Sequence, residues 1–214
     1  MTDVFKKLGI NKIVIASTNI AKIEQIKNFD VFKNVELLLL SDFNLGPVEE
    51  TEDTLEGNAL LKARYCYKCT GLPSLSDDSG FFVNALDGFP GVHCAKLAET
   101  LSKTGRRDYN MVAKVINDKL GDNANKSSMF SSVIVFVADG MEYIARGDTP
   151  GTFVYPAMNG TGINNGGYNP YFIPEDSAIS YAQKGIVTEY FDNHRSIAVQ
   201  NLIKKMELAI SKAS

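Results

Sequence analysis

The sequence has few cysteines, no surplus of positive charge and no long apolar run. Only three of its 214 residues are cysteines, and an odd count in a chain of this length is not typical of a secreted disulfide framework. Acidic residues outnumber Lys and Arg by 25 to 22, which gives a formal net charge of -3. A general nucleic-acid-binding protein more often has a basic surplus, so we expect no nucleic-acid partner.

The longest apolar runs, around residues 35–40 and 133–138, have the length of strands. Neither run can span a bilayer. Residues 1–12 also lack the apolar stretch of a signal peptide. We therefore expect a cytoplasmic protein with no membrane partner.

Cys66 and Cys69 form a single C-x-x-C within a segment that has helical spacing. No second such pair and no H-x-x-x-H follows, so a metal or redox motif is incomplete. We interpret both residues as packed thiols.

Strand-like and helix-like patterns alternate in the first half of the chain. Short apolar, β-branched stretches predict strands at 12–17 and 35–40, and helical spacing predicts helices at 20–29 and 54–69. Asp53 with Glu56 suggests a cap for the second helix. Residues 75–83 are apolar on both sides of an acidic break at 77–80.

The second half adds a hairpin and a closing helix. Two apolar runs, 130–138 and 141–145, flank an Asp-Gly turn. We also expect helices at 105–120 and 194–209, a short strand at 152–155 and irregular structure at 159–169. The whole pattern predicts an α/β fold with a mixed sheet, in a single domain of residues 1–214.

Short polar residues stand where the first predicted strand passes into a helix: Ser17, Thr18 and Asn19, with Lys22 one turn later. Free N–H groups and the helix dipole at such a junction favour an anion. An ordinary helix cap with a solvated lysine explains this group by itself equally well, because no Walker glycine loop is present.

Glu50, Asn58 and Lys62 form a second group. Asn58 and Lys62 are four residues apart and share a helix face, and Glu50 lies in the loop that leads to that helix. The carboxylate could hold a metal and the lysine a phosphate. Taken alone, a charged and solvated helix face is the simpler interpretation.

The run Asp77-Asp78-Ser79-Gly80 follows an apolar strand. Adjacent carboxylates cost free energy there unless they are exposed, paired or bound to metal. Carboxylates are ligands for Mg²⁺, and a neighbouring carboxylate can orient or deprotonate an attacking water. A capping residue in a turn would require only one aspartate, so we favour a functional site.

His194 and Arg195 precede the last predicted helix. A guanidinium suits planar recognition, and an imidazole can donate to or stack near a base. A pair that faces water at the start of a helix is the alternative.

Taken together and in this order, the four groups resemble the inosine-triphosphatase family, also described as XTP/dITP diphosphatases. The similarity runs from about residue 12 to 202 and is strongest in the stretches E-T-E-D-T-L-E-G-N-A-L-L-K-A-R, G-L-P-S-L-S-D-D-S-G and D-G-F-P-G-V-H-C-A-K. The resemblance implies an elongated, two-lobed α/β fold around a central twisted mixed β-sheet, with the active site in the cleft between the lobes. It also implies a homodimer that hydrolyses ITP, dITP and XTP to the monophosphate and pyrophosphate with Mg²⁺, or with Mn²⁺ in its place.

The resemblance also implies roles for individual residues. Asp78 would be the candidate base with Asp77 beside it, and Glu50 and Asp78 would bind the metal. The triphosphate and the rest of the nucleotide would be bound by Ser17, Thr18, Asn19, Lys22, Lys62, Ser79, Lys96, Gly167, Tyr168, Asn169, His194 and Arg195.

The sequence departs from the family around the base. The family has F-G-Y-D-P in its late loop, whereas this chain has Gly166 in place of the stacking aromatic and Asn169 in place of the Asp. Glu189 replaces a Lys, and Asn193 replaces a Ser. A lost stacking surface is worth roughly 1–3 kcal/mol, although Tyr168, Tyr171 or Tyr190 could compensate. We hypothesise that hydrolysis is retained and that discrimination among bases is weakened or changed.

Two alternatives stay open at this point. The chain could be a pyrophosphatase for another modified or standard nucleotide, with Glu189 accepting a hydrogen bond from an amino group. It could also bind nucleotides without turnover, although the intact Glu50, Lys62, Asp77 and Asp78 favour an enzyme. The sequence leaves open the base, the sugar and which of the two aspartates activates water.

Overall fold

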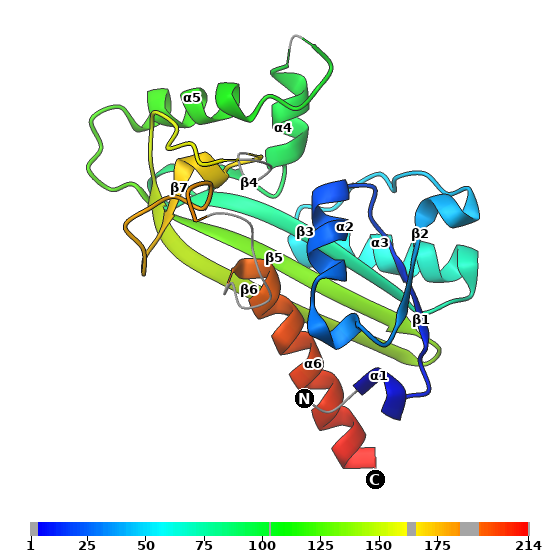
Figure 1. Cartoon of the computed structure of the whole chain (residues 1–214). Helices are drawn as coiled ribbons and strands as arrows, with labels where there is room; N and C mark the ends of the chain where they lie inside the picture. Colours follow the sequence, from blue (N-terminus) through cyan, green and yellow to red (C-terminus); the bar gives the residue numbers. More distant parts are fainter. Residues whose placement is uncertain (1–3, 103, 162–165, 185–192, 214) are drawn as a thin grey trace. The chain divides into compact units, whose positions relative to one another are not determined.

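The computed structural model describes residues 4–102, 104–161, 166–184 and 193–213. Within them, a seven-stranded sheet has the order β2-β1-β3-β5-β6-β7, and β4 pairs with β3 (Figure 1). The strands are β1 (Lys12–Ile15), β2 (Glu36–Leu39), β3 (Ser74–Val83), β4 (Pro90–Gly91), β5 (Ser127–Ala138), β6 (Met141–Phe153) and β7 (Phe172–Pro174).

The sheet is mixed, as the sequence predicts. Strand β1 runs parallel to β2 and to β3, whereas β4 is antiparallel to β3 and β7 is antiparallel to β6. The helices are α1 (Val4–Lys7), α2 (Ile20–Lys27), α3 (Leu55–Thr70), α4 (Cys94–Thr100), α5 (Tyr109–Leu120) and α6 (His194–Ala213), with short 3-10 turns η1 (Asp30–Phe32), η2 (Leu40–Phe43), η3 (Asn84–Leu86) and η5 (Asn169–Tyr171).

The chain divides into two compact units. The first comprises Met1–Asp78, Ser132–Gly147 and Thr188–Ser214, and the second comprises Ser79–Ser131 and Asp148–Val187. None of the described helices is long and apolar enough to cross a membrane.

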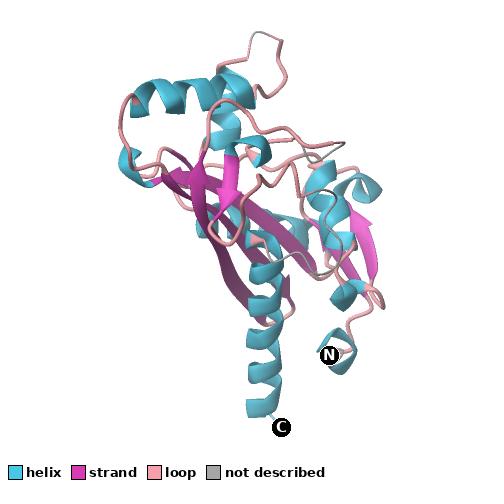
Figure 2. Ribbon diagram, turned by 60° about the vertical axis from the view of Figure 1, so that its left-hand side comes forward, coloured by secondary structure: helices cyan, strands magenta, loops and turns pink. Residues whose placement is uncertain are grey.

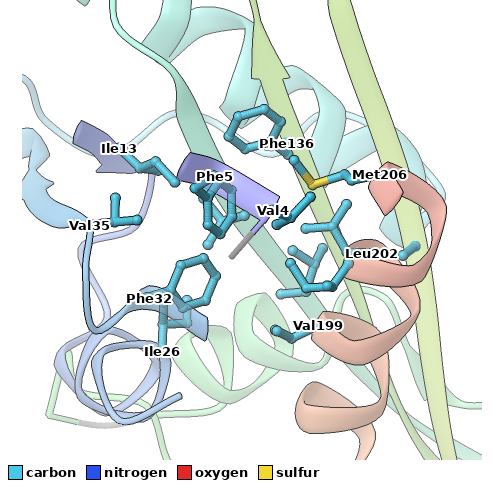
Figure 3. Packing of buried hydrophobic residues seen from close by; sticks show 14 of the residues in the cluster. Val4, Phe5, Ile13, Ile26, Phe32, Val35, Phe136, Val199, Leu202 and Met206 are labelled. Carbon is cyan, nitrogen blue, oxygen red and sulfur yellow. The ribbon is translucent and has the colours of Figure 1, made fainter. Parts of the chain in front are cut away.

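The core of the first unit is aliphatic and aromatic (Figure 3). Phe5 stacks on Phe32 with ring centroids 5.5 Å apart and meets Phe136 at 5.8 Å. Leu202 and Met206 come from α6, the long helix that leads to the C terminus (Figure 2), and both are fully buried. This packing holds α6 against the part of the sheet that bears the candidate site.

The second unit has an aromatic core. Tyr168 is buried and stacks on Phe81 with ring centroids 4.7 Å apart, while Phe130, Phe172 and Tyr181 pack around them. Burial holds the pKa of the Tyr168 phenol well above its usual range, so this side chain is a neutral core residue.

Helix α3 is fixed to β3 by two serines. The hydroxyl of Ser74 donates to the carbonyl oxygen of Ala63 at 2.7 Å, and that of Ser76 donates to Ala59 at 2.5 Å. Serines in a buried strand satisfy their hydroxyls in this way, since an unpaired buried hydroxyl is destabilising. The contacts align α3 with the strand that carries the two aspartates.

Several local predictions were wrong. Residues 75–83 form one continuous strand with no break at the acidic residues, and residues 152–153 belong to β6 and not to a separate strand. Helix α3 is capped by Thr54, whose side chain accepts from the Gly57 amide, and not by Asp53. Helix α5 begins at Tyr109 and not at residue 105, because Asp108 caps it, and α4 was not predicted.

The prediction of two packed thiols holds for one of them. Cys66 is fully buried, and burial raises the pKa of its thiol to about 11, whereas Cys69 is exposed. A thiol with so high a pKa is a poor nucleophile and metal ligand near neutral pH.

Candidate active site

Asp77 and Asp78 are consecutive residues of β3 in the first unit, and their side chains meet different elements. Successive residues of a strand point to opposite faces. Asp77 contacts side chains from α2 and α6, and Asp78 contacts a side chain from α3. The two carboxylates therefore have separate surroundings.

The Asp77 carboxylate is buried within a set of donors. Its Oδ2 lies 2.7 Å from Lys22 Nζ and 3.2 Å from Arg195 Nη2, and Oδ1 accepts from the Ser132 hydroxyl at 3.0 Å. Burial by itself would raise the pKa of Asp77, but the charges of Arg195 and Lys22 outweigh it and hold the pKa well below its usual range. Asp77 is therefore ionised near neutral pH, a weak base, and a fixed partner for Lys22 and Arg195.

The Asp78 carboxylate faces a lysine that it shares with Glu50. Lys62 Nζ lies 2.7 Å from Asp78 Oδ1 and 2.7 Å from Glu50 Oε1, and it also donates to the Asp77 carbonyl at 3.0 Å. Burial raises the pKa of Asp78 to about 6, although Lys62 and Lys22 act in the opposite direction. Its Oδ2 is buried without a hydrogen-bond partner.

Lys62 and Glu50 both remain charged in this arrangement. Burial favours the neutral form of each, but the attraction between Lys62 and the two carboxylates prevails, so the pKa of Lys62 is raised and that of Glu50 is lowered. Glu50 is the more exposed carboxylate, which agrees with its staying ionised while Asp78 holds a proton up to about pH 6.

Asn58 holds the loop that carries Glu50. Its side chain is buried, and it accepts from the Glu52 amide at 2.9 Å and donates to the Glu52 carbonyl at 3.0 Å. Asn58 is therefore a clamp on the backbone two residues beyond Glu50. It does not reach into the charge cluster itself.

The start of α2 places Lys22. Asn19 caps the helix by accepting from the Ala21 and Lys22 amides, and Ser17 accepts from the Asn19 amide at 3.1 Å. Thr18 is exposed at this junction. The cap fixes the first helical turn, from which Lys22 extends to Asp77.

The start of α6 places Arg195 and His194. Asn193 caps the helix by accepting from the Arg195 and Ser196 amides at 2.9 and 3.0 Å. A Ser, which the family has at this position, is also a good N-cap residue, so the replacement keeps the cap. Gly147 of β6 packs closely against the backbone of this first turn. A Cβ at Gly147 would lie 2.2 Å from the His194 carbonyl oxygen. His194 is buried, and burial, followed by the charge of Arg195, lowers its pKa well below the usual range.

The remaining predicted residues lie in the second unit. Ser79 follows Asp78 in β3, and Lys96 is exposed on α4. Gly167, with φ of +62°, lines a hollow of about 370 Å³ together with Gly166, Arg106, Arg107 and Tyr109. Tyr168 is buried against Phe81, and Asn169 begins η5. Glu189 and Tyr190 lie outside the described residues.

Two residues of the site were missed by sequence reasoning. Ser132 lies in an apolar strand, and no sequence motif marks it as a site residue. Only the fold brings its hydroxyl to Asp77. Gln25 lies three residues after Lys22 on the same face of α2, and its Oε1 accepts from Arg195 Nη1. That spacing could have revealed it.

The cluster fits a divalent metal bound partly by substrate. Among the described residues, no group of three or more His, Cys, Asp or Glu side chains is arranged to hold a metal ion. Mg²⁺, however, needs one or two carboxylates, with phosphate and water completing its shell. Glu50 and the unpartnered Oδ2 of Asp78 are carboxylate oxygens of this kind.

The fold and this cluster define an α/β protein whose buried carboxylates and lysines form a site compatible with phosphate and metal. The chain belongs to the Ham1 family, whose model matches residues 13–205. It is 34% identical over 196 residues to a dITP/XTP pyrophosphatase of Ruegeria pomeroyi, covering 90% of this chain and 93% of the relative. It is 35% identical over 193 residues to one of Flavobacterium johnsoniae, covering 90% and 96%.

Solved structures agree with this assignment. The Staphylococcus aureus Ham1 protein matches with a TM-score of 0.79 at 28% identity, over 92% of this chain and 99% of that one. A nucleoside-triphosphatase / dITP/XTP pyrophosphatase from Mycobacterium abscessus matches with a TM-score of 0.64 at 28% identity, over 92% and 98%.

Proposed function

We propose that the chain is a nucleoside-triphosphate pyrophosphatase that hydrolyses ITP, dITP and XTP to the monophosphate and pyrophosphate. Its membership of the Ham1 family and its relatives named dITP/XTP pyrophosphatases support this function. The observation that carries it is the Glu50–Lys62–Asp78 cluster, in which two carboxylates share one lysine and one carboxylate oxygen has no partner.

The charges of the cluster favour a requirement for a metal ion. Lys22, Lys62 and Arg195 face Glu50, Asp77 and Asp78, so the cationic and carboxylate side chains are equal in number. Such a balanced set offers a triphosphate little net attraction. A Mg²⁺ ion held by Glu50 and Asp78 would supply the positive charge that the phosphates need.

Asp78 is the residue that we assign to water activation. A general base works best when its pKa lies near the working pH, and the pKa of Asp78 is raised to about 6. The Asp78 carboxylate would accept the proton of the attacking water. Asp77 instead keeps Lys22 and Arg195 in place.

The phosphates bind at the start of α2 and beside α3. Lys22 and Lys62 lie on opposite sides of the β3 backbone, and both approach the Asp77 carbonyl, at 3.5 and 3.0 Å. Phosphoryl transfer needs positioning and charge neutralisation more than covalent help, which two lysines supply. Ser17, Thr18 and Asn19 join them at the α2 terminus.

His194 and Arg195 would read the base. The resemblance also predicts nucleotide contacts for five residues of the second unit, Ser79, Lys96, Gly167, Tyr168 and Asn169, of which Tyr168 is a buried core residue stacked on Phe81. Neutral His194 donates or accepts a hydrogen bond without adding charge. Gly166 is exposed and offers no ring for stacking, so we expect weaker discrimination among bases than an aromatic residue would give. Preference for another modified nucleotide is the second candidate.

A homodimer and a cleft between two lobes remain predictions from the family resemblance, and a cytoplasmic location and a single domain remain predictions from the sequence pattern. Mg²⁺, with Mn²⁺ in its place as the alternative, is likewise a prediction for this chain.

The function is tested by measuring pyrophosphate release from ITP, dITP, XTP and the four standard ribonucleotides, with Mg²⁺ and with chelator. We expect metal-dependent release from ITP, dITP and XTP, with a smaller preference over GTP and ATP than a stacking aromatic residue would give. Release from a different base would replace the substrate and keep the chemistry. No release from any nucleotide by folded protein would refute the enzyme.

A further inference from the structure

Gln25 is a polar residue of α2 that contacts the candidate site through Arg195. Its Oε1 accepts a hydrogen bond from Arg195 Nη1, while Arg195 Nη2 lies 3.2 Å from Asp77 Oδ2. The two terminal nitrogens of one guanidinium are therefore held by two different residues. Because the group is planar, two such contacts fix its orientation as well as its position.

The orientation of the Gln25 amide follows from its partner. A guanidinium has donors and no acceptor, so the oxygen of the amide must face Arg195. The Gln25 Nε2 then points away, and it is buried without a hydrogen-bond partner. An unpaired buried donor lowers the free energy of unfolding. A glutamine at position 25 is therefore not explained by its contribution to stability.

Glutamine differs from glutamate at this place in one physical respect. A glutamate would hold Nη1 equally well, and it would pair with the arginine charge. It would also add a negative charge on α2, one turn from Lys22 and near the Asp77 carboxylate that both cations already share. Gln25 holds the guanidinium and adds no negative charge. A negative charge at this position would repel a polyanionic substrate.

We infer that Gln25 is a positioning residue that sets the plane of the Arg195 guanidinium, and thereby base selectivity, while keeping the site free of a further negative charge. The inference rests on the proposed function, in which Arg195 reads the base. It predicts that alignment and charge separate into two measurable effects, on selectivity and on affinity.

Two substitutions separate these effects. Gln25→Met removes the acceptor at similar size, and we expect the ratio of kcat/KM for dITP to that for dATP to fall by about tenfold, in line with the loss of one hydrogen bond to a charged group. Gln25→Glu restores the acceptor. It keeps the ratio and raises KM for both nucleotides by a similar factor, and this rise shrinks at high salt.

Matched controls show whether the effect acts through Arg195. Gln200→Glu makes the same charge change on the exposed surface of α6 and should leave both quantities unchanged. A double-mutant cycle of Gln25→Met with Arg195→Lys should be non-additive in the selectivity ratio. An unchanged ratio in Gln25→Met, or additivity in the cycle, would overturn the inference.

The wild-type protein separates this inference from the proposed function. Turnover of dITP by the wild type tests the function, and the ratios between variants test Gln25. If the wild type releases no pyrophosphate, calorimetric binding of dITP and dATP with Mg²⁺ gives the same ratios. Equal dITP and dATP affinity ratios in wild type and Gln25→Met would then count against Gln25.

Discussion

Asp77 and Asp78 are neighbours on β3, yet the Asp77 carboxylate is paired with Lys22 and Arg195 while the Asp78 carboxylate is paired with Lys62. The separation gives the two residues opposite acid–base properties. The pKa of Asp77 is held well below its usual range by Arg195 and Lys22, whereas the pKa of Asp78 is raised to about 6 by burial. A division of labour between two adjacent residues follows, which the sequence alone left open.

Asp78→Asn should abolish most turnover and leave the fold intact. We expect kcat to fall by roughly 10²–10⁴ because the water loses its base. The melting temperature should fall less than in an Asp77 variant, because Lys62 keeps Glu50 as a partner and burial already disfavours the Asp78 charge. Pyrophosphate release and thermal unfolding check both halves of this prediction.

Asp77→Asn should instead cost stability. Removing one partner of a buried ion pair leaves the others uncompensated, and such changes typically cost about 3–5 kcal/mol. Urea unfolding measures the loss, and turnover of the folded fraction shows how far Lys22 and Arg195 have moved. If both Asn variants lost the same kcat at the same stability, the assignment of a single base to Asp78 would fail.

Asn58→Leu should raise the Mg²⁺ concentration needed for half-maximal activity. The substitution removes both hydrogen bonds to Glu52, each worth about 0.5–1.5 kcal/mol, and so releases the loop that carries Glu50. Turnover at saturating Mg²⁺ should be affected less than the metal requirement, because Asp78 is untouched. A Mg²⁺ titration at fixed dITP measures this.

The control for Asn58→Leu is a variant that loses stability at a place remote in sequence from Glu50. Asp108→Ala removes the cap of α5 in the second unit, which typically costs about 0.5–2 kcal/mol. It should lower stability and leave the Mg²⁺ requirement unchanged. An equal shift in both variants would mean that Asn58 acts only through general stability.

The parts of the fold that follow from local pattern were predictable from the sequence. Strand β1, the helix α2 with its Asn19 cap and the helix α3 have apolar spacing that reports their buried faces. The sequence wrongly predicted a break within strand β3, because Ser74, Ser76 and the two aspartates are polar residues at buried positions. Their partners are α3 carbonyls and cations distant in sequence, which no local pattern shows.

The candidate site was predicted in the same uneven way. Lys22, Glu50, Lys62, Asp77, Asp78 and Arg195 do come together in the first unit. Asn58, which the sequence grouped with Glu50 and Lys62, holds the backbone at Glu52 instead, and Ser132 and Gln25 were missed. Such supporting contacts depend on tertiary geometry, whereas charged residues at special spacings can be recognised beforehand.

Gly147→Ala should destabilise the protein and disturb the start of α6. A Cβ there would lie 2.2 Å from the His194 carbonyl oxygen and 2.4 Å from the Ala198 amide nitrogen, both backbone atoms that cannot rotate away. Overpacking of this kind typically costs about 1–3 kcal/mol. Because Arg195 lies in the same turn, selectivity for dITP over dATP should also fall.

Gly46→Ala is the matched control, since nothing lies within 4 Å of a Cβ at that position. It should leave stability and selectivity at their wild-type values. If Gly147→Ala were as stable as Gly46→Ala, the close approach of β6 to α6 would be disproved.

His194 should make the protein less stable as the pH falls below its ordinary pKa. Its pKa in the folded state is lowered well below 6.5, by burial and then by Arg195, with Lys22 adding to the shift and Asp77 opposing it. Near pH 6.5 the unfolded chain therefore binds a proton at His194 that the folded protein does not bind. The stability contributed by neutral His194 is complete above that pH and is lost as the pH falls toward the lowered pKa.

The raised pKa of Asp78 works in the other direction, because its protonation near pH 6 favours the folded state. The two effects separate when His194→Gln is compared with wild type, since Asp78 is common to both. We expect the free energy of unfolding of wild type to fall more steeply from about pH 7 to about pH 5 than that of the variant. His93→Gln, which changes the exposed histidine, is the matched control for the loss of one imidazole. A His194→Gln slope equal to that of wild type would show that His194 takes up a proton as readily in the folded protein as in the unfolded chain, which would contradict its lowered pKa.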